Sequence, residues 1–354
     1  MISPRRIAIV LYCLTSAGVA QQAVNPPAPA PSSAPKTVAL HVVVTTKNGK
    51  PVSGLKLQDF AVQLDKKPQP ILSFQPAEAS ASAVAPIDTI LLIDTVNTRF
   101  FHVAYERDQI ERFLRQNGGK LAQPTSLVVL TDTSVSVTPQ STQDGNALAG
   151  FLRQSEASLR DIGRDAGFYG WIEQFQISTR ALQQITTYEA SRPGRKLLIW
   201  ISPGWPLLSG PEVDLTFKDQ QNFFHDLVNL SSALRNAQIT LSSVDPLGSD
   251  DLLGYRTTFY EEFTKGVPVA GKMQIGNLAL QVLALQSGGR VLNSNNNVAQ
   301  LITRAASDAE AFYTITIAPP PAEHKDQYRA VAVTLSPDHP GLAVHTLTGY
   351  YDQP

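Results

Sequence analysis

The residues best equipped for chemistry in this sequence follow a short apolar run, Thr89–Asp94. Asp94, Asn97 and Thr98 carry a carboxylate, an amide and a hydroxyl at closely spaced positions. Oxygen atoms of these kinds are the ligands that a hard divalent cation prefers. The same residue types also cap turns and the helices that follow them. The spacing alone therefore indicates either a cation site on Asp94 and Thr98 or a structural cap.

A second apolar run, Leu197–Ile201, is also followed directly by polar and aromatic residues. It lies within PGRKLLIWISPGWPLL, between a turn with two cations and the breaker Ser202-Pro203-Gly204. Short apolar runs bounded by breakers predict strands that are buried on both faces of a parallel sheet. In open α/β sheets, ligands bind beyond the carboxyl ends of such strands, where the winding direction reverses. The functional site is therefore expected at the two tips, 94–98 and 202–205.

Strands and helices alternate between residues 87 and 308, which is typical of repeated strand–helix–strand units. The expected strands are Thr89–Asp94, Ser126–Thr131, Leu197–Ile201, Ile239–Val244 and Arg290–Leu292, with Ser134–Thr138 as an edge hairpin partner. The expected helices are Val103–Asn117, Ala147–Leu159, Phe168–Tyr188, Asn222–Asn236, Gly276–Gln286 and Val298–Asp308. The predicted fold class is α/β, with a Rossmann-like, doubly wound, mostly parallel sheet and an additional β unit.

That β unit comes from the segments on either side, residues 37–76 and 309–354. In the first segment, Leu40, Val42 and Val44 alternate with other residues, as do Phe60, Val62 and Leu64. In the second, the expected strands are Ala311–Ile317, Tyr328–Leu335 and Leu342–Thr346. The first segment is too small to be stable alone. We therefore expect it to dock on the α/β domain that follows. We also expect its strands to pack with those of the second segment, in an arrangement that could be one sheet.

The beginning of the chain has the pattern of an exported protein. Residues 1–20 combine two arginines, the apolar stretch Ile7–Leu14 and small residues, which predicts a signal peptide. Residues 21–36 are rich in Pro, Ala and Ser and are expected to form an extended tether. The only cysteine, Cys13, lies in the signal segment, so the mature chain should contain no thiol. We expect a secreted or periplasmic, cell-envelope location, with no transmembrane span after signal removal.

The order of several motifs resembles the von Willebrand factor A-related family abundant in Acidobacteria. They are LHVVVTTKNGKPVSGLKLQDFAVQLDKKPQPILSF, LLIDTVNT, PGRKLLIWISPGWP, LALQVLALQSGGRVL, AFYTITIAPP and VHTLTGYY, which together span most of the mature chain. The resemblance implies a Rossmann-like A domain flanked by β structure on an exported protein. Better-studied A domains bind protein partners, often through a divalent cation, so the resemblance also implies a binding role.

The metal motif of A domains is Asp-x-Ser-x-Ser, assisted by a Thr and an Asp from later loops. Asp94 and Thr98 match its first and last positions, but Val96 at the middle position offers no side-chain oxygen. Pro203 stands where the later carboxylate would follow its strand, and Thr179 is the candidate for the loop Thr. Because a hard cation needs several oxygen ligands, we expect at most a weak, degenerate site and no resident cofactor.

An alternative is a phosphatase-like hydrolase. The segment Asp94–Thr98 also resembles the Asp-x-Asp-x-Thr loop of haloacid-dehalogenase-type phosphatases, in which one Asp is the nucleophile and the second a general acid. Val96 again replaces the second carboxylate, and only Asp250-Asp251 could imitate the late acidic pair of that family. A purely structural component of the cell envelope is a further alternative.

The favoured function is non-enzymatic protein binding, of an adhesion or assembly type. The near balance of 29 basic and 30 acidic residues argues against nucleic acid as the partner. Asn97 and Trp205 at the strand tips are candidate partner-binding residues, because exposed aromatic residues often anchor interfaces. Tyr255 and Phe259 are two more, in the long segment Pro246–Met273. The alternative for Trp205 is a lid packed over the sheet edge.

Overall fold

The computed structural model describes residues 36–78, 87–98, 100–155, 167–205, 215–247 and 259–352. The predicted signal peptide, nearly all of the tether, Asp250-Asp251 and Tyr255 lie outside the described residues. For Phe259 the backbone is described and the side chain is not. Residues Lys36–Pro354 form one compact unit, and the fold below is the fold of that unit.

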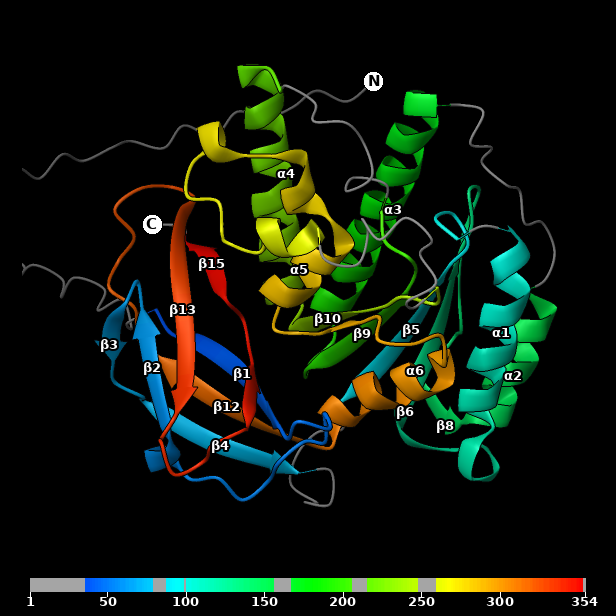
Figure 1. Cartoon of the computed structure of the whole chain (residues 1–354), viewed down its shortest axis with the longest axis horizontal. Coiled ribbons are helices and arrows are strands. Elements are labelled where there is room, and N and C mark those ends of the chain that lie inside the picture. The colour runs from blue at the N-terminus through cyan, green and yellow to red at the C-terminus, as the bar shows by residue number, and fades with distance from the viewer. Residues whose placement is uncertain are drawn as a thin grey trace, which may run out of the picture. The chain divides into compact units, whose positions relative to one another are not determined.

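The unit is built on a mixed, mostly parallel sheet (Figure 1). Its strands are β5 (Asp88–Asp94), β6 (Lys120–Leu130), β7 (Val135–Val137), β8 (Thr142–Asp144), β9 (Lys196–Ile201), β10 (Ile239–Val244) and β11 (Val291–Leu292). They are arranged in the order β11-β10-β9-β5-β6-β7, and β8 also pairs with β6. Only β7 and β8 run antiparallel to their neighbour within the described sheet. The predicted α/β class, its strands and the edge hairpin are confirmed.

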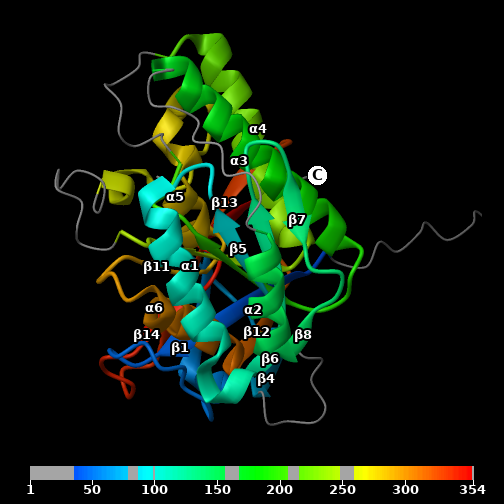
Figure 2. The same ribbon diagram turned by 90° about the vertical axis from the view of Figure 1, so that its right-hand side faces the viewer.

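Helices pack against both faces of this sheet (Figure 2). They are α1 (Phe100–Leu114), α2 (Gly145–Gln154), α3 (Gly167–Ala190), α4 (Phe217–Asn236), α5 (Leu280–Gln286) and α6 (Val298–Ala306). Successive side chains of a strand point to opposite faces. Accordingly, Leu91 and Ile93 of β5 pack with α1, α2 and α6, whereas Ile90 and Leu92 pack with α3, α4 and α5. Both faces of the central strand are buried, as its unbroken apolar run predicts.

Local sequence sets where several of these elements begin. The Thr216 hydroxyl accepts a hydrogen bond from the Asp219 backbone N–H, and the Asp219 carboxylate accepts one from the Thr216 backbone N–H. Helix α4 therefore begins at Phe217, earlier than the predicted start at Asn222. The side chain of Asp144 caps α2 by accepting hydrogen bonds from the backbone N–H groups of Asn146 and Ala147. At the start of β9, Lys196 is buried and its ammonium donates to the carbonyls of Glu189 and Ala237. One cation thus satisfies carbonyls at the ends of both α3 and α4.

The flanking segments form two four-stranded sheets. They contain β1 (Val38–Thr45), β2 (Phe60–Leu64), β3 (Lys67–Gln69), β4 (Ser73–Glu78), β12 (Ala311–Ile317), β13 (Gln327–Leu335), β14 (Ala343–His345) and β15 (Gly349–Asp352). Their orders are β14-β1-β12-β4 and β15-β13-β2-β3. The expectation of a single sheet is therefore wrong. Each amphipathic sheet must cover its apolar face, and stacking achieves this, with Leu40 and Tyr313 of one sheet packing on Phe60 and Val62 of the other.

Single helical turns complete the described chain, at η1 (Leu57–Asp59), η2 (Gln116–Gly119), η4 (Phe259–Phe263), η5 (Ala270–Lys272), η6 (Ile275–Leu278) and η7 (Ser307–Ala309). The predicted helix Gly276–Gln286 is divided into η6 and α5. Two arginines join the α/β part to a turn of the β part: Arg290 donates to the carbonyl of Gly49, and Arg304 to that of Asn48. None of the helices within the described ranges has the length and apolar character needed to cross a membrane.

Candidate functional site

Asp94 ends β5 and is completely buried. Its Oδ1 accepts hydrogen bonds from the backbone N–H groups of Val96 (3.0 Å) and Asn97 (3.1 Å). Its Oδ2 accepts from the Asn97 side-chain amide (2.7 Å) and from Nε1 of Trp200 (2.8 Å), on the neighbouring strand β9. Both carboxylate oxygens are thus engaged by neutral donors of the protein itself, and Asp94 acts as a cap for the turn after β5.

The electrostatics of Asp94 follow from this burial. Removal from water raises the pKa of its carboxyl group, and the hydrogen bonds from Trp200 and Asn97 oppose that shift. A carboxylate in this position is shielded from solvent on every side. It therefore has no direct route to a substrate phosphate or to a hydrated ion.

The rest of the 94–98 turn is held by α3. The Asn97 amide donates a second hydrogen bond to Oγ of Ser178 (2.8 Å), and Nε2 of Gln174 donates to the carbonyl of Val96 (3.1 Å). The side chain of Val96 is buried in the apolar cluster beneath α3 and α4. The hydrophobic core thus occupies the position where an A-domain metal site would need an oxygen.

At the second tip, the chain turns back over the sheet. Gly204 has φ of +99°, and a Cβ there would collide with the side chain of Gln281, so glycine is required. Trp205 is 3% exposed and packs edge-on against Trp200 (5.5 Å between ring centroids) and Phe175 (5.9 Å). The expectation of an exposed Trp205 anchor is wrong, because its ring closes the tip of β9 as part of the core. This is the lid alternative from the sequence.

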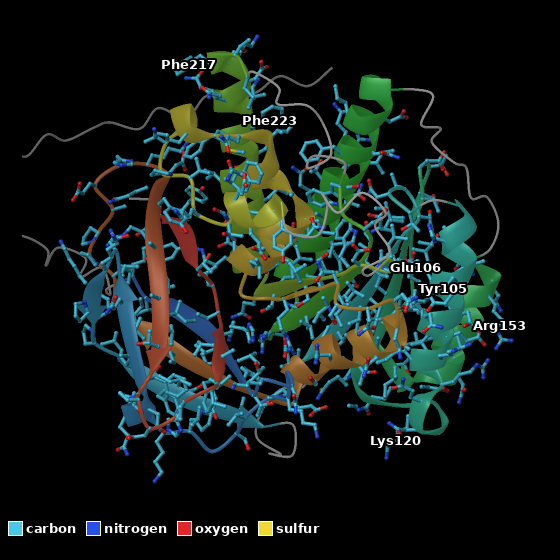
Figure 3. All side chains as sticks on the ribbon, in the orientation of Figure 1. Tyr105, Glu106, Lys120, Arg153, Phe217 and Phe223 are labelled. Carbon is cyan, nitrogen blue, oxygen red and sulfur yellow. The ribbon has the colours of Figure 1, made fainter. Side chains whose placement is uncertain are left out.

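Glu106 on α1 is a site residue that the sequence reasoning missed (Figure 3). It is 1% exposed and faces Thr98, whose hydroxyl is close enough to affect the glutamate but makes no hydrogen bond of normal geometry with it. Burial, and then the charge of Asp94, raise the pKa of Glu106 well above its usual range. Its signal in the sequence was its position: Glu106 lies at helical spacing with Val103 and Ile110, on the buried stripe of α1.

The residues predicted as cation ligands do not form a complete site, although Glu106 beside them has two buried oxygens without a hydrogen-bond partner. Both oxygens of Asp94 are already hydrogen-bonded, and neither Val96 nor Pro203 supplies a side-chain oxygen. Thr179 is not a loop residue, as a ligand role would require: it lies inside α3 and donates to the carbonyl of Phe175. Across the described ranges, His, Cys, Asp and Glu side chains form no group of three or more that could hold a metal ion.

The long segment after β10 is described only in part. Within it, Tyr260 of η4 is buried against Ala279 and Val282, so this turn packs on α5. The partner-binding roles predicted for Tyr255 and Phe259 concern side chains outside the described residues, and they stay predictions. Asn97 is half-buried and uses its amide to hold Asp94 and Ser178, so it serves the turn.

No protein-family model and no curated protein matches this chain. Similar solved structures include an aerotolerance-related membrane protein from Bacteroides fragilis NCTC 9343 with multiple mutations to serines (10% identity, 63% of this chain and 98% of that chain, TM-score 0.34). Another is the pilus adhesin SpaC from Lactobacillus rhamnosus GG, with 8% identity over 88% of this chain and 49% of that chain and a TM-score of 0.40. A third is the SpRpn10 VWA domain, with 14% identity over 63% of this chain and 97% of that chain and a TM-score of 0.30. Identities and scores this low establish no family for the chain.

Proposed function

We propose that this chain is an exported, non-enzymatic protein-binding module, built on a doubly wound sheet of the von Willebrand factor A type and belonging to the acidobacterial branch. The strand order supports the fold: numbered along the chain without β8, which lies off this path, the sheet strands follow 6-5-4-1-2-3, which is the doubly wound order. Export rests on the signal pattern of residues 1–20, and a location outside the cytoplasm follows from it.

The observation that carries the non-enzymatic role is the fully occupied carboxylate of Asp94. A nucleophilic aspartate needs one oxygen directed at the substrate, and a metal ligand needs a free lone pair. Here four donors from the protein occupy the two oxygens. Asp94 at the end of β5 therefore serves a structural role, and we place partner binding on another surface of the domain.

The binding surface that we propose lies at the start of α4. Phe217, its first residue, is 68% exposed (Figure 3), and Val269, just before η5, is 53% exposed. The turn η5 packs against α4, so the exposed Phe217 and Val269 belong to neighbouring elements. Exposed apolar side chains on adjacent elements are typical of a docking surface for another protein. This assignment replaces Trp205, which is buried.

A phosphatase assay with magnesium separates this proposal from the enzymatic alternative. We expect no turnover of p-nitrophenyl phosphate by the purified full chain. The diagnostic variants are Asp94→Asn and, as a matched control at the other end of the same strand, Asp88→Asn. Activity that persists in the control and disappears in a folded Asp94→Asn variant would overturn the proposal.

Two further measurements test the binding role and the absence of a resident cation. Pull-down from envelope extracts should recover a partner with the wild-type chain and less of it with Phe217→Ser, while Tyr188→Ser, which is similarly exposed at the end of α3, binds normally. Equal recovery by all three proteins would exclude the α4 surface.

Calorimetry with magnesium, manganese and calcium should give no binding tighter than the millimolar range. Cation binding with a micromolar dissociation constant that disappears in Asp94→Asn would contradict the structural role of Asp94.

A further inference from the structure

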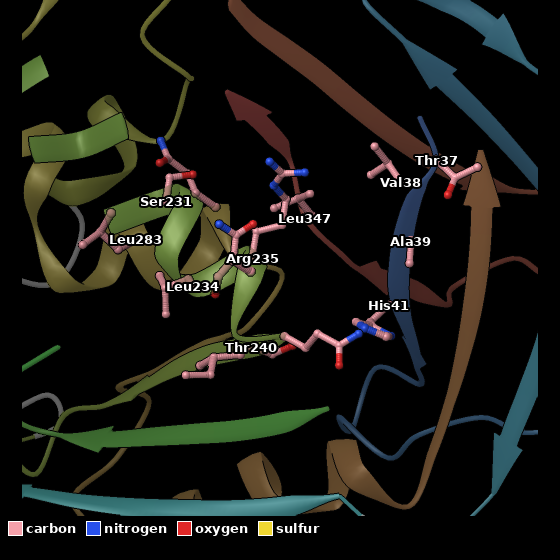
Figure 4. Close-up of a pocket in the computed structure, with 15 residues that line it drawn as sticks. Thr37, Val38, Ala39, His41, Ser231, Leu234, Arg235, Thr240, Leu283 and Leu347 are labelled. Atoms are coloured by element: carbon pink, nitrogen blue, oxygen red, sulfur yellow. The ribbon is translucent and has the colours of Figure 1, made fainter. Parts of the chain in front are cut away.

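A cavity of about 180 Å³ lies at the edge of the sheet opposite to Asp94. Its lining comes from the first residues of β1, the end of α4, the start of β10 and the end of α5 (Figure 4). Arg235 and Leu347 lie toward one side of it, and Ala39 and His41 of β1 lie on the other. This volume is far above the ~15 Å³ that one water molecule requires. The cavity is therefore large enough for a small organic molecule.

The cavity is rich in hydrogen-bond donors that have no acceptor. Arg235 lines it, its guanidinium forms no hydrogen bond or ion pair with any described residue, and its buried Nε has no partner. Gln286 also lines it, is 7% exposed, and has an unpartnered Nε2. Leaving such groups unpaired inside a protein is unfavourable, because they have lost their hydrogen bonds to water. An acceptor bound in the cavity would remove that cost.

A second guanidinium lies directly behind the wall. Arg195 is 6% exposed, contacts the hydroxyl of the lining residue Thr240 at 3.3–3.4 Å, and has an unpartnered Nη1. Its position is fixed over the ring of Phe312 (4.6 Å), as that of Arg235 is fixed over Tyr350 (5.0 Å). Both cations thus contact aromatic rings, and neither forms an ion pair with a carboxylate of the described residues.

The local charge is uncompensated. None of the lining residues is Asp or Glu. Burial lowers the pKa of Arg195 to about 10, and only the more distant Asp308 opposes this shift. Burial and the charge of Arg195 lower the pKa of His41 to about 3, so this lining residue is neutral. Arg195 is buried and Arg235 is half-buried, and the absence of a lining anion is unfavourable for both, because buried charges are normally paired.

We propose that this cavity binds a small organic carboxylate, held by Arg235 and Gln286 with the charge of Arg195 behind them. A planar guanidinium matches the geometry of a carboxylate and can donate to both of its oxygens. The remaining wall is mixed, and its apolar part, with Leu234, Ile239, Leu283 and Leu347, suits a short hydrocarbon chain better than a bare inorganic anion. The proposal is independent of the protein-binding function, since the cavity lies at the amino end of β10.

Calorimetry on the full chain tests the proposal with three probes: pentanoate, its neutral isostere pentanamide, and inorganic phosphate. Pentanoate should bind, pentanamide should bind at least tenfold more weakly, and phosphate should also be weaker because it leaves the apolar wall unfilled. No saturable binding of pentanoate at 20 mM, or equal binding of the amide, would overturn the carboxylate site. Tighter binding of phosphate than of pentanoate would overturn the organic ligand.

Variants then assign the residues. Arg235→Gln should raise the pentanoate dissociation constant at least tenfold, Gln286→Leu severalfold, and Arg235→Lys should retain part of the affinity because it keeps the charge. The matched control is Arg153→Gln, an exposed arginine on α2 far from the cavity (Figure 3). Melting temperatures establish that each variant is folded. Unchanged affinity in folded Arg235→Gln and Gln286→Leu variants would show that pentanoate binds elsewhere.

Discussion

The two ends of the central sheet differ in whether the charged side chains there have hydrogen-bond partners. At the carboxyl end, four hydrogen-bond donors occupy both oxygens of Asp94, although Glu106 and Thr98 beside it have buried oxygens without a partner. At the amino end, Arg195 and Arg235 each lie over one aromatic ring, and no carboxylate lines the cavity that Arg235 borders. The carboxylate at the position that the fold favours for ligands is fully hydrogen-bonded, whereas the opposite end of the sheet carries unpaired donors beside a cavity.

This difference shows that location in a fold does not by itself make a site. The carboxyl edge of an open α/β sheet is where ligands are expected. In this chain, Trp200 and Val96 fill that edge with an indole donor and a core side chain. A structural cap such as Asp94 has its oxygens paired after folding, whereas an unpaired buried donor beside a cavity, such as that of Arg235, indicates a site.

The largest effect is expected from an arginine that does have its partner. Arg290 is buried and forms a double hydrogen-bonded ion pair with Asp308. Arg290→Met would leave that carboxylate buried and unpaired, and it should lower the free energy of unfolding by about 4 kcal/mol. Arg235→Met, which breaks no ion pair, should cost about 1 kcal/mol or less without ligand. Urea denaturation measures both, and equal losses would contradict the assignment of Arg235 as unpaired.

Asp94→Ala should have the next largest effect. It leaves two backbone N–H groups, the Asn97 amide and the Trp200 indole without an acceptor, and we expect a loss of about 3 kcal/mol. Asp94→Asn keeps the shape and one acceptor, so it should cost less. The measurement is the urea midpoint of each variant at pH 7. A loss below about 1 kcal/mol for Asp94→Ala would mean that the carboxylate does not hold the turn.

Glu106 gives a pH-dependent contrast with its neighbour. Because its pKa is raised in the folded state, the folded protein binds more protons than the unfolded one above the unfolded value of 4.5. Its contribution to stability is therefore full below that pH and is lost as the pH rises, by at most ~1.4 kcal/mol per pH unit for one proton. Glu106→Gln removes this dependence. We expect the variant to gain stability relative to wild type between pH 5 and 8, and parallel curves would contradict the shift.

His41 should show the smallest effect at neutral pH and the opposite sign. Its folded pKa of about 3 lies below the unfolded value of 6.5, so the unfolded state binds the extra proton between these values. Stability associated with His41 is present above pH 6.5 and is lost as the pH falls toward 3. His41→Gln should reduce this acid loss. His345→Gln is the control, because its pKa of about 4 gives a narrower window. A larger effect at position 345 would contradict the larger pKa shift of the buried His41.

Much of the architecture could be predicted from the sequence. The unbroken apolar runs at Thr89–Asp94 and Leu197–Ile201 indicated strands buried on both faces, and they are β5 and β9. Alternating residues such as Leu40 and Val42 indicated a one-sided sheet, and their buried faces are confirmed. Local pattern carries this information because burial of one or both faces imposes its own periodicity on a strand.

The state of each site was decided only by the tertiary structure. The indole that occupies Asp94 comes from Trp200, 106 positions away, and Trp205 is buried because Phe175 of a different element packs on it. The cavity joins β1 to α4 and α5, across roughly two hundred residues of sequence. Whether a donor or acceptor is hydrogen-bonded depends on which atoms come into contact when the strands and helices pack. A single sequence gives the donors and acceptors but not those contacts.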